Sequence, residues 1–263
     1  MDVRDKVVVI TGAARGIGAA LAERFATEGA AGIVVSDVDG SGARGVAERI
    51  NGKAVGVAAD VTDPAQVREL VATAEREFGP VDLFCSNAGV ASGVGLDAPD
   101  EAWATAWGVN VMAHVHAAKA VLPSMLERGR GYLLHTVSAA GLLTAPGDAP
   151  YSTTKHAALG FAEWLGVTYG AAGIGVSTLC PMGVRTDMLL PGIEEGNPSA
   201  LAVAASGELL TPEQVAETVV AGLAEERFLI LPHPEVGKMH AHKAADPDRW
   251  LAGMQKTFGT PKS

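Results

Sequence analysis

Short runs of β-branched residues alternate with longer amphipathic stretches along most of this chain, and that alternation limits how it can fold. The runs predicted to be strands are 6–11, 32–36, 54–59, 81–86, 131–136, 175–180 and 228–231. The first run, Lys-Val-Val-Val-Ile-Thr, does not alternate apolar with polar residues, which is typical of a strand buried on both faces. The pattern therefore predicts an α/β fold with a doubly wound sheet of about seven parallel strands and helices on both faces.

The segments between these runs are predicted to be helices, namely 16–28, 41–51, 64–78, 99–127, 150–172 and 212–225. Thr62 or Asp63 is a suitable N-cap for the third helix, because Pro64 follows in its first turn. Pro123 should bend or interrupt the long segment 99–127, since proline removes a helical hydrogen bond. No stretch is long enough to link two separate domains, so residues 1–263 are expected to form one domain.

Residues 189–210 differ in composition from this repeating pattern, because they are rich in Gly, Pro, Ser, Ala and Glu. They follow the carboxyl end of a predicted strand, which is where ligands of parallel sheets bind. We interpret them as a mobile lid over the substrate. The alternative is an irregular surface insertion.

Residues 232–263 form a C-terminal extension, with further helices predicted around 236–245 and 248–258. On the second of these, Trp250, Leu251 and Met254 can form one apolar stripe. We expect the extension either to cover a neighbouring subunit or to close the substrate pocket.

Charge and composition argue against several classes of function. The formal net charge is −10, and no run of Lys and Arg supplies the basic patch typical of nucleic-acid binding or favours an anionic membrane. Cys85 and Cys180 lie in apolar runs, which is typical of buried thiols and not of a disulfide framework. Residues 164–184 carry no formal charge, but their glycines and Pro181 suit a helix end, a turn and a strand better than a membrane span. The first residues contain no secretory signal, so the protein is expected to be cytoplasmic.

A glycine-rich turn, Thr-Gly-Ala-Ala-Arg-Gly-Ile-Gly over residues 11–18, joins the first strand to the first helix. Gly12, Gly16 and Gly18 let the backbone turn sharply and approach a pyrophosphate, whose charge then faces the helix N-terminus. Arg15 and Ile17 lie in the same turn. A glycine-rich turn without a ligand is the alternative, but the strand before it and the helix after it favour a dinucleotide site.

Asp37 ends the second predicted strand and bears on which dinucleotide is bound. A carboxylate there can accept hydrogen bonds from both adenosine ribose hydroxyls and repels a 2′-phosphate, which favours NAD over NADP. Arg15 is a competing observation, since a guanidinium nearby can bind that phosphate. It can equally be a solvated loop residue, so we expect NAD, with NADP as the alternative.

Later motifs follow the glycine turn in a fixed order, and together they resemble the short-chain dehydrogenase/reductase family up to about residue 231. The matching segments are Asp60-Val61, Ser86-Asn87-Ala88-Gly89, Asn110 in Gly-Val-Asn-Val, Ser138 in Thr-Val-Ser, Tyr151-x3-Lys155, and Pro181-Met182-Gly183-Val184-Arg185-Thr186. Two positions depart from the family pattern. Ser86 replaces an asparagine, which is expected to loosen a structural hydrogen bond, and Met182 stands where the family has glycine.

The resemblance implies a Rossmann-like fold, a nicotinamide cofactor and a catalytic tetrad, with Asp60 and Val61 at the adenine and Val184 and Thr186 at the nicotinamide carboxamide. The expected catalytic residues are Asn110, Ser138, Tyr151 and Lys155. The expected cofactor-binding residues are Gly12, Arg15, Gly16, Ile17, Gly18, Asp37, Asp60, Val61, Asn87, Ala88, Gly89, Tyr151, Lys155, Pro181, Val184 and Thr186. The family also implies a homotetramer or homodimer.

Tyr151 and Lys155 are four residues apart on a predicted helix and so share one face. A phenol has a pKa near 10, and a cation about 4 Å away supplies roughly the 4 kcal/mol needed to ionise it near neutral pH. Tyr151 can then be the base in alcohol oxidation and the acid in ketone reduction. Ser138 can orient the substrate oxygen, and the resemblance implies that Lys155 holds the nicotinamide ribose and that Asn110 seats a water. The alternative is a packed aromatic residue beside a solvated lysine.

These observations predict an NAD-dependent oxidoreductase that interconverts a secondary alcohol and a ketone. An NADP-dependent ketone reductase and a non-catalytic NAD-binding sensor or scaffold are the alternatives. Apolar residues near the lid hint at a hydrophobic substrate, although they can also be core: Leu142, Leu143, Met188, Leu189 and Leu190. No metal site is expected, because the spacing of the histidines, including His114 and His135, does not suit one.

Overall fold

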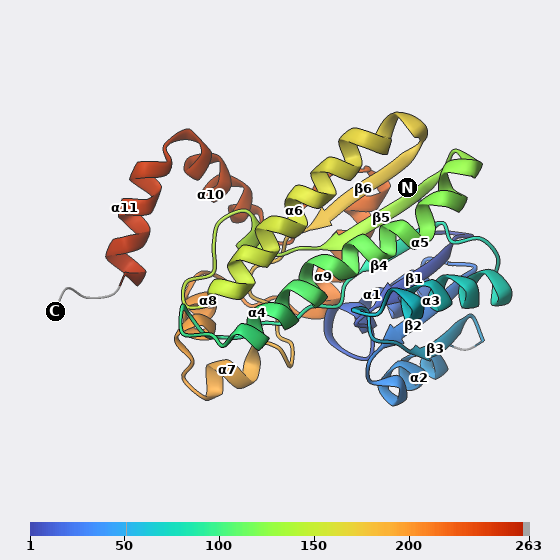
Figure 1. Cartoon of the computed structure of the whole chain (residues 1–263), viewed down its shortest axis with the longest axis horizontal. Helices are drawn as coiled ribbons and strands as arrows, with labels where there is room; N and C mark the ends of the chain where they lie inside the picture. Colours follow the sequence, from blue (N-terminus) through green and yellow to red (C-terminus); the bar gives the residue numbers. More distant parts are fainter. Residues whose placement is uncertain (51, 260–263) are drawn as a thin grey trace.

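The computed structural model describes residues 1–50 and 52–259, and its centre is a sheet of seven strands (Figure 1). Every pairing in the sheet is parallel, and the strand order is β3-β2-β1-β4-β5-β6-β7. The strands are β1 (Val7–Thr11), β2 (Gly32–Asp37), β3 (Ala54–Ala58), β4 (Leu83–Ser86), β5 (Gly131–Thr136), β6 (Ile174–Leu179) and β7 (Leu229–Ile230). The predicted doubly wound α/β fold is confirmed.

Helices cover both faces of the sheet, and each face has its own apolar core. On one face lie α1 (Gly16–Thr27), α2 (Gly40–Arg49) and α9 (Pro212–Ala224). On the other lie α3 (Pro64–Glu77), α5 (Ala113–Arg128) and α6 (Ala149–Tyr169). Asp63 caps α3 as expected, because its carboxylate accepts from the backbone N–H of Ala65. The predicted end of the second helix at Asn51 lies outside the described residues.

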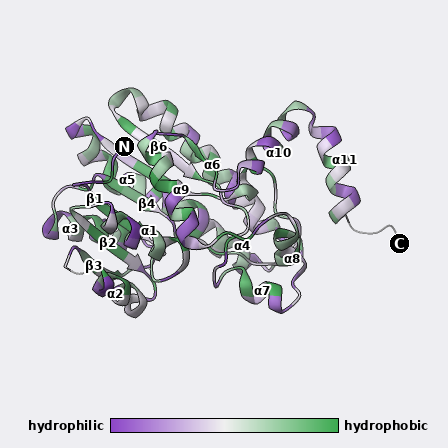
Figure 2. Ribbon diagram, turned by 180° about the vertical axis from the view of Figure 1, so that it is seen from behind, coloured by the Kyte–Doolittle hydropathy of each residue, from purple (hydrophilic) through white to green (hydrophobic). Residues whose placement is uncertain are grey.

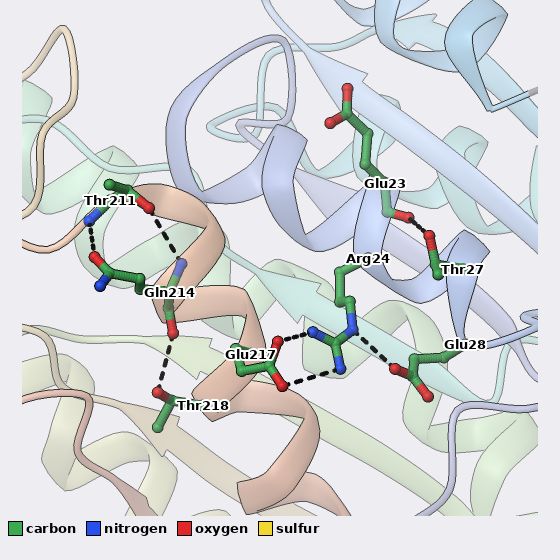
Figure 3. A network of polar contacts seen from close by, with 8 residues as sticks. All are labelled: Glu23, Arg24, Thr27, Glu28, Thr211, Gln214, Glu217 and Thr218. Carbon is green, nitrogen blue, oxygen red and sulfur yellow. Dashed lines mark hydrogen bonds and ion pairs between the residues drawn. The ribbon is translucent and has the colours of Figure 1, made fainter.

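A polar network joins α1 to α9 at the surface (Figure 3). Arg24 of α1 pairs with Glu28 on its own helix and with Glu217 of α9. Thr211 and Gln214 form a reciprocal capping box at the start of α9. The Arg24–Glu217 pair thus links α1 to α9 at the surface, and the capping box satisfies the start of α9.

The order in which strands are added to the sheet reverses at β1, which lies between β2 and β4. The strands β2 and β3 extend the sheet on one side of β1, and the strands from β4 to β7 extend it on the other. Loops that leave β1 and β4 therefore diverge and open a crevice at the carboxyl ends of the strands. Ligands of such sheets bind in this crevice, and the candidate site residues lie around it.

The segment 99–127 is interrupted, but not at Pro123 as predicted. A π-helical turn, Gly108–Met112, separates α4 (Asp100–Trp107) from α5. Pro123 lies inside α5 on its exposed side, where the carbonyl of the equally exposed Lys119 can bond water, and α5 continues past it. Pro123 therefore does not interrupt the helix, and the interruption of the segment lies at the π-helical turn.

Residues 189–210 contain two short helices, α7 (Leu190–Glu194) and α8 (Pro198–Ala205). The C-terminal extension contains α10 (Pro234–Ala245) and α11 (Pro247–Phe258), close to the predicted bounds. Both views of the ribbon show α11 standing clear of the sheet and its covering helices (Figure 1 and Figure 2), and it has no buried residue. Within residues 1–50 and 52–259, no helix is both long and apolar enough to cross a membrane.

Candidate active site

The glycine-rich turn leaves β1 and enters α1 with an open helix N-terminus. Gly12 and Gly16 have φ angles of 62° and 56°, which favour glycine. A Cβ at Gly18 would lie 2.3 Å from the carbonyl oxygen of Gly12, so only glycine fits at this close approach. Arg15 at the N-cap makes no side-chain capping bond, and the first turn of α1 has no acidic residue. The free N–H groups and helix dipole therefore suit an anionic group such as a pyrophosphate.

Asp37 lies at the carboxyl end of β2, beside this turn. One of its carboxylate oxygens accepts from the N–H of Ala14 at 3.1 Å, and the other accepts from the N–H of Asp39 at 3.0 Å. The carboxylate is thus held at the crevice and keeps lone pairs for further donors. Arg15 points instead to Asp187, 3.6 Å away, and both side chains are exposed.

Asn87 joins the loops after β1 and β4. Its amide nitrogen donates to the carbonyl oxygens of Thr11 and Gly12, each at 3.0 Å, and its amide oxygen accepts from the hydroxyl of Thr136. Ala88 packs on the glycine turn, since a Cβ at Gly12 would lie 2.6 Å from its Cα. Ser86 fits the expected loss of a hydrogen bond, because its hydroxyl is buried without a partner among the described residues.

Asn110 lies in the π-helical turn and is fully buried. Its amide oxygen accepts from the N–H of Val90, and its amide nitrogen donates to the carbonyl of Val90 and to the hydroxyl of Thr154. A Cβ at Gly89 would lie 3.4 Å from both the amide oxygen of Asn110 and the Nζ of Lys155. The π turn thus brings Asn110 to the loop after β4, next to Lys155.

Ser138 follows β5 in a strained conformation, with φ 147° and ψ 158°. Non-glycine residues rarely adopt this region, and such strain clusters at functional sites. The Ser138 hydroxyl accepts from the N–H of Ala140 at 3.1 Å and so caps the short 3₁₀ turn Ala139–Gly141. The Ser138 hydroxyl lies 3.5 Å from the carbonyl oxygen of Pro181 and close enough to Tyr151 to influence the pKa of the phenol.

Tyr151 and Lys155 share one face of α6, and the ammonium lies 5.4 Å from the centre of the phenol ring. The Nζ of Lys155 donates to the carbonyl of Thr136 at 3.1 Å, and the side chain is 2% exposed. The sheet therefore supplies a backbone acceptor that aims the ammonium toward the ends of β4 and β5.

Burial dominates the protonation of this pair. Burial raises the pKa of Tyr151, the nearby Ser138 hydroxyl acts in the opposite direction, and the charge of Asp148 raises it further. Burial lowers the pKa of Lys155 to about 8. The lowered phenol pKa expected from the sequence is not found, because burial outweighs the effect of the Ser138 hydroxyl.

Asp148 is a residue of the site that the sequence interpretation missed. Its carboxylate is 3% exposed and accepts from the N–H groups of Tyr151, Ser92 and Gly93 and from the Ser92 hydroxyl, at 2.6–3.0 Å. It is the N-cap of α6 and ties the start of that helix to the loop after β4. The sequence contains a signal for this N-cap, because Asp148 is followed two residues later by Pro150 in the first turn of the helix.

The remaining expected cofactor residues lie at the same edge of the sheet. The carboxylate of Asp60 accepts from the backbone and hydroxyl of Thr62, and Val61 is buried beside it. Pro181 and Val184 are buried after β6, and Thr186 lies 3.3 Å from the position of a Cβ at Gly16. The loop after β6 thus faces the glycine turn across the crevice.

Two of the histidines whose spacing does not suit a metal site form a buried pair. The Nδ1 atoms of His114 on α5 and His135 on β5 lie 2.8 Å apart, and both rings are at most 1% exposed. Burial lowers the pKa of His114 well below its usual value and that of His135 to about 4, so the pair is neutral and one Nδ1 donates to the other. Among the described residues, no group of three or more His, Cys, Asp or Glu side chains could hold a metal ion.

Comparison with known proteins gives consistent matches. A family model described as short chain dehydrogenase matches residues 6–194. The chain is 38% identical over 237 residues to a 1-deoxy-11-beta-hydroxypentalenate dehydrogenase of Streptomyces exfoliatus, covering 88% of this chain and 84% of that protein. It is 32% identical to the Escherichia coli oxidoreductase UcpA, covering 96% and 92% of the two chains. A crystal structure of a short chain dehydrogenase/reductase from Burkholderia phymatum in complex with NAD matches with a TM-score of 0.84, at 32% identity over 100% of this chain and 99% of that one.

Proposed function

The chain belongs to the short chain dehydrogenase family, and on that premise we propose that it interconverts a hydrophobic secondary alcohol and its ketone with NAD as cofactor. An oxidoreductase acting on CH–OH groups follows from the family; the cofactor, the substrate and the residue roles are our proposal. The observation that carries it is the convergence of Ser138, Tyr151 and Lys155 beside an open helix N-terminus.

The side chains can divide the proton chemistry among them. Ser138 donates a hydrogen bond to the substrate oxygen and holds it beside Tyr151. The Tyr151 phenolate takes the hydroxyl proton in oxidation, and the phenol returns it in reduction. The Lys155 ammonium favours the phenolate electrostatically and holds the ribose of the cofactor, while Asn110 keeps α5 in register with the loop that seats a water. The nicotinamide, when bound, supplies the hydride chemistry.

NAD is proposed over NADP because of Asp37. Its carboxylate is fixed by Ala14 and Asp39 at the place where an adenosine ribose would lie, and it would repel a 2′-phosphate. Arg15, which is engaged with Asp187, offers no comparably fixed phosphate ligand. The Burkholderia phymatum protein, similar over the whole chain, was solved in complex with NAD. The other proposed cofactor contacts are those named from the sequence.

A hydrophobic substrate is proposed because exposed apolar side chains gather around the mouth of the site. Val94 and Leu96 lie on the loop after β4, and Leu96 is 89% exposed. Leu190 and Leu201 are exposed on the lid segment 189–210, and Met188 is exposed just before it. The two segments meet, because the Asn197 amide donates to the carbonyl of Gly93 at 3.1 Å. Of the leucines expected there, Leu142 and Leu143 are buried and belong to the core.

A homo-oligomer, either a dimer or a tetramer, is also proposed. Its support is the outer face of α6, where Phe161 stacks on Trp164 with ring centres 6.3 Å apart. Trp164 is 53% exposed and Val167 is 87% exposed, so this face offers apolar area for a second copy.

The test is a cofactor titration followed by a panel of secondary alcohols, with wild type compared with Tyr151→Phe and Asp37→Ala. We expect turnover with NAD, loss of turnover with retained NAD binding in Tyr151→Phe, and weaker NAD binding with relaxed preference in Asp37→Ala. Near-normal turnover by Tyr151→Phe would remove the acid–base assignment. Preference of the wild type for NADP would remove the Asp37 assignment, and NAD binding without turnover of any alcohol would favour a sensor.

A further inference from the structure

The end of the lid runs beside the loop after β6 as a short parallel ladder. The N–H of Leu210 donates to the carbonyl of Gly183 at 3.1 Å, and the N–H of Arg185 donates to the carbonyl of Leu210 at 2.9 Å. Leu209 packs against Gly183, where a Cβ would lie 2.4 Å from the leucine methyl. The loop proposed to contact the nicotinamide and the end of the substrate lid are therefore joined directly.

His233, at the N-cap of α10, extends this ladder where the two backbones diverge. Its Nδ1 lies 3.1 Å from the N–H of Met182, and its Nε2 lies 3.1 Å from the carbonyl of Glu208. Because Met182 can only donate at this atom, Nδ1 accepts, and the ring proton is on Nε2, which donates to Glu208. The residue is 2% exposed, so both bonds are shielded from water.

We infer that His233 is a positioning residue that couples the nicotinamide loop to the substrate lid. One ring nitrogen fixes Met182 in the loop, and the other fixes the end of the lid, so a shift of either segment is passed to the other through a rigid imidazole. His233 lies beyond residue 194, outside the range matched by the family model.

The second polar anchor of α10 supports this role. The ammonium of Lys243, in the last turn of α10, donates to the carbonyls of Leu142 and Leu143, each at 2.8 Å. These carbonyls end the short 3₁₀ turn that Ser138 caps. Between these anchors, Val236 is fully buried against the same segment. The helix is thus fixed to the active-site loops at both ends, which holds His233 in place.

The two nitrogens can be tested separately with isosteric amides. The amide oxygen introduced by His233→Asn can take the place of Nδ1, so this variant keeps the acceptor for Met182 and loses the bond to Glu208. The amide nitrogen of His233→Gln has the bond path of Nε2, so this variant keeps the bond to Glu208 and loses the acceptor for Met182. His233→Leu removes both bonds, and Lys238→Met on the exposed side of α10 is the matched control.

The measurements are the NADH dissociation constant from nicotinamide fluorescence and the hydrogen exchange of backbone amides in the full chain. We expect His233→Gln to weaken NADH binding about fivefold to tenfold and to speed exchange at Met182. We expect His233→Asn to bind NADH within about twofold of wild type while exchange in residues 189–210 rises. Addition of NADH to the wild type should slow exchange at the end of the lid together with Met182–Arg185.

The inference rests on the proposed function, but the two can fail separately. A wild type that does not bind NADH contradicts the proposed function, while the exchange of the unliganded variants still tests the bridge. Equal changes in the Asn and Gln variants, or exchange like wild type in both, would overturn the coupling role. If neither variant folds, exchange in the wild type decides the matter, because independent protection of the lid end and the loop would also overturn it.

Discussion

Replacing Lys155 by methionine should abolish turnover and yet stabilise the fold at neutral pH. Burial lowers the pKa of Lys155 from 10.5 to about 8, so between these values the folded chain holds one proton fewer than the unfolded chain. Stability therefore rises with pH across this window, and below pH 8 the full penalty of the buried charge is present. At roughly 1.4 kcal/mol for each pH unit, that penalty is about 3 kcal/mol.

The variant also loses a hydrogen bond. Methionine leaves the carbonyl of Thr136 without the donor that Lys155 supplies at 3.1 Å, which costs about 1 kcal/mol. We therefore expect Lys155→Met to be more stable than its parent by about 2 kcal/mol at pH 7 and less stable by about 1 kcal/mol near pH 10.5.

The assay is urea unfolding at several pH values from 7 to 10.5, with both chains in a Tyr151→Phe background so that no neighbouring phenol titrates. Other ionisable groups are common to the two chains and cancel in the difference. A difference in unfolding free energy that stays constant with pH would refute the reasoning, because it would mean that the Lys155 ammonium is not desolvated in the folded state.

Three further predictions concern neighbouring features. Ser138→Gly should be about 1 kcal/mol more stable than Ser138→Ala in thermal unfolding, since glycine relieves the strain at φ 147°, while both lose turnover; equal stability would mean that the backbone is not strained. Asp148→Asn should lower the pKa of Tyr151 because it removes a negative charge, and the rising limb of the pH profile of alcohol oxidation should therefore move to lower pH. The variant should also lose about 2 kcal/mol of unfolding free energy. A shift of the rising limb to higher pH would contradict this. Arg24→Met should reduce the unfolding free energy by less than about 1 kcal/mol, and the loss should shrink in high salt, because Glu217 is exposed; a loss of several kcal/mol would show that the bridge between α1 and α9 is more than a surface pair.

The sequence predicts the order of strands and helices well because the hydrophobic periodicities of strand and helix are strong and local. The prediction fails where long-range packing determines the local conformation. Nothing within Gly-Val-Asn-Val-Met distinguishes the π turn at Asn110 from ordinary helix, and Pro123 disrupts α5 little because its ring lies on the exposed side.

In the candidate active site, too, local sequence predicts some features and long-range packing determines the others. Tyr151 and Lys155 are predicted from their spacing on one helix, whereas their protonation depends on how deeply the sheet and loops bury them. His233 has no local signal at all, because its two partners, Met182 and Glu208, are brought together only when the C-terminal extension packs on the body. The pairing of His114 with His135 likewise needs α5 laid on β5.

The buried pair of His114 and His135 makes the stability of the fold depend on pH. Both rings are less basic in the folded chain than in the unfolded chain, so stability is complete above about pH 6.5 and falls as acid is added toward pH 4. Lys155 acts in the same sense in a separate window, because its contribution to stability rises with pH between about 8 and 10.5. Oxidation of an alcohol releases a proton, so a rise in pH also draws that reaction forward.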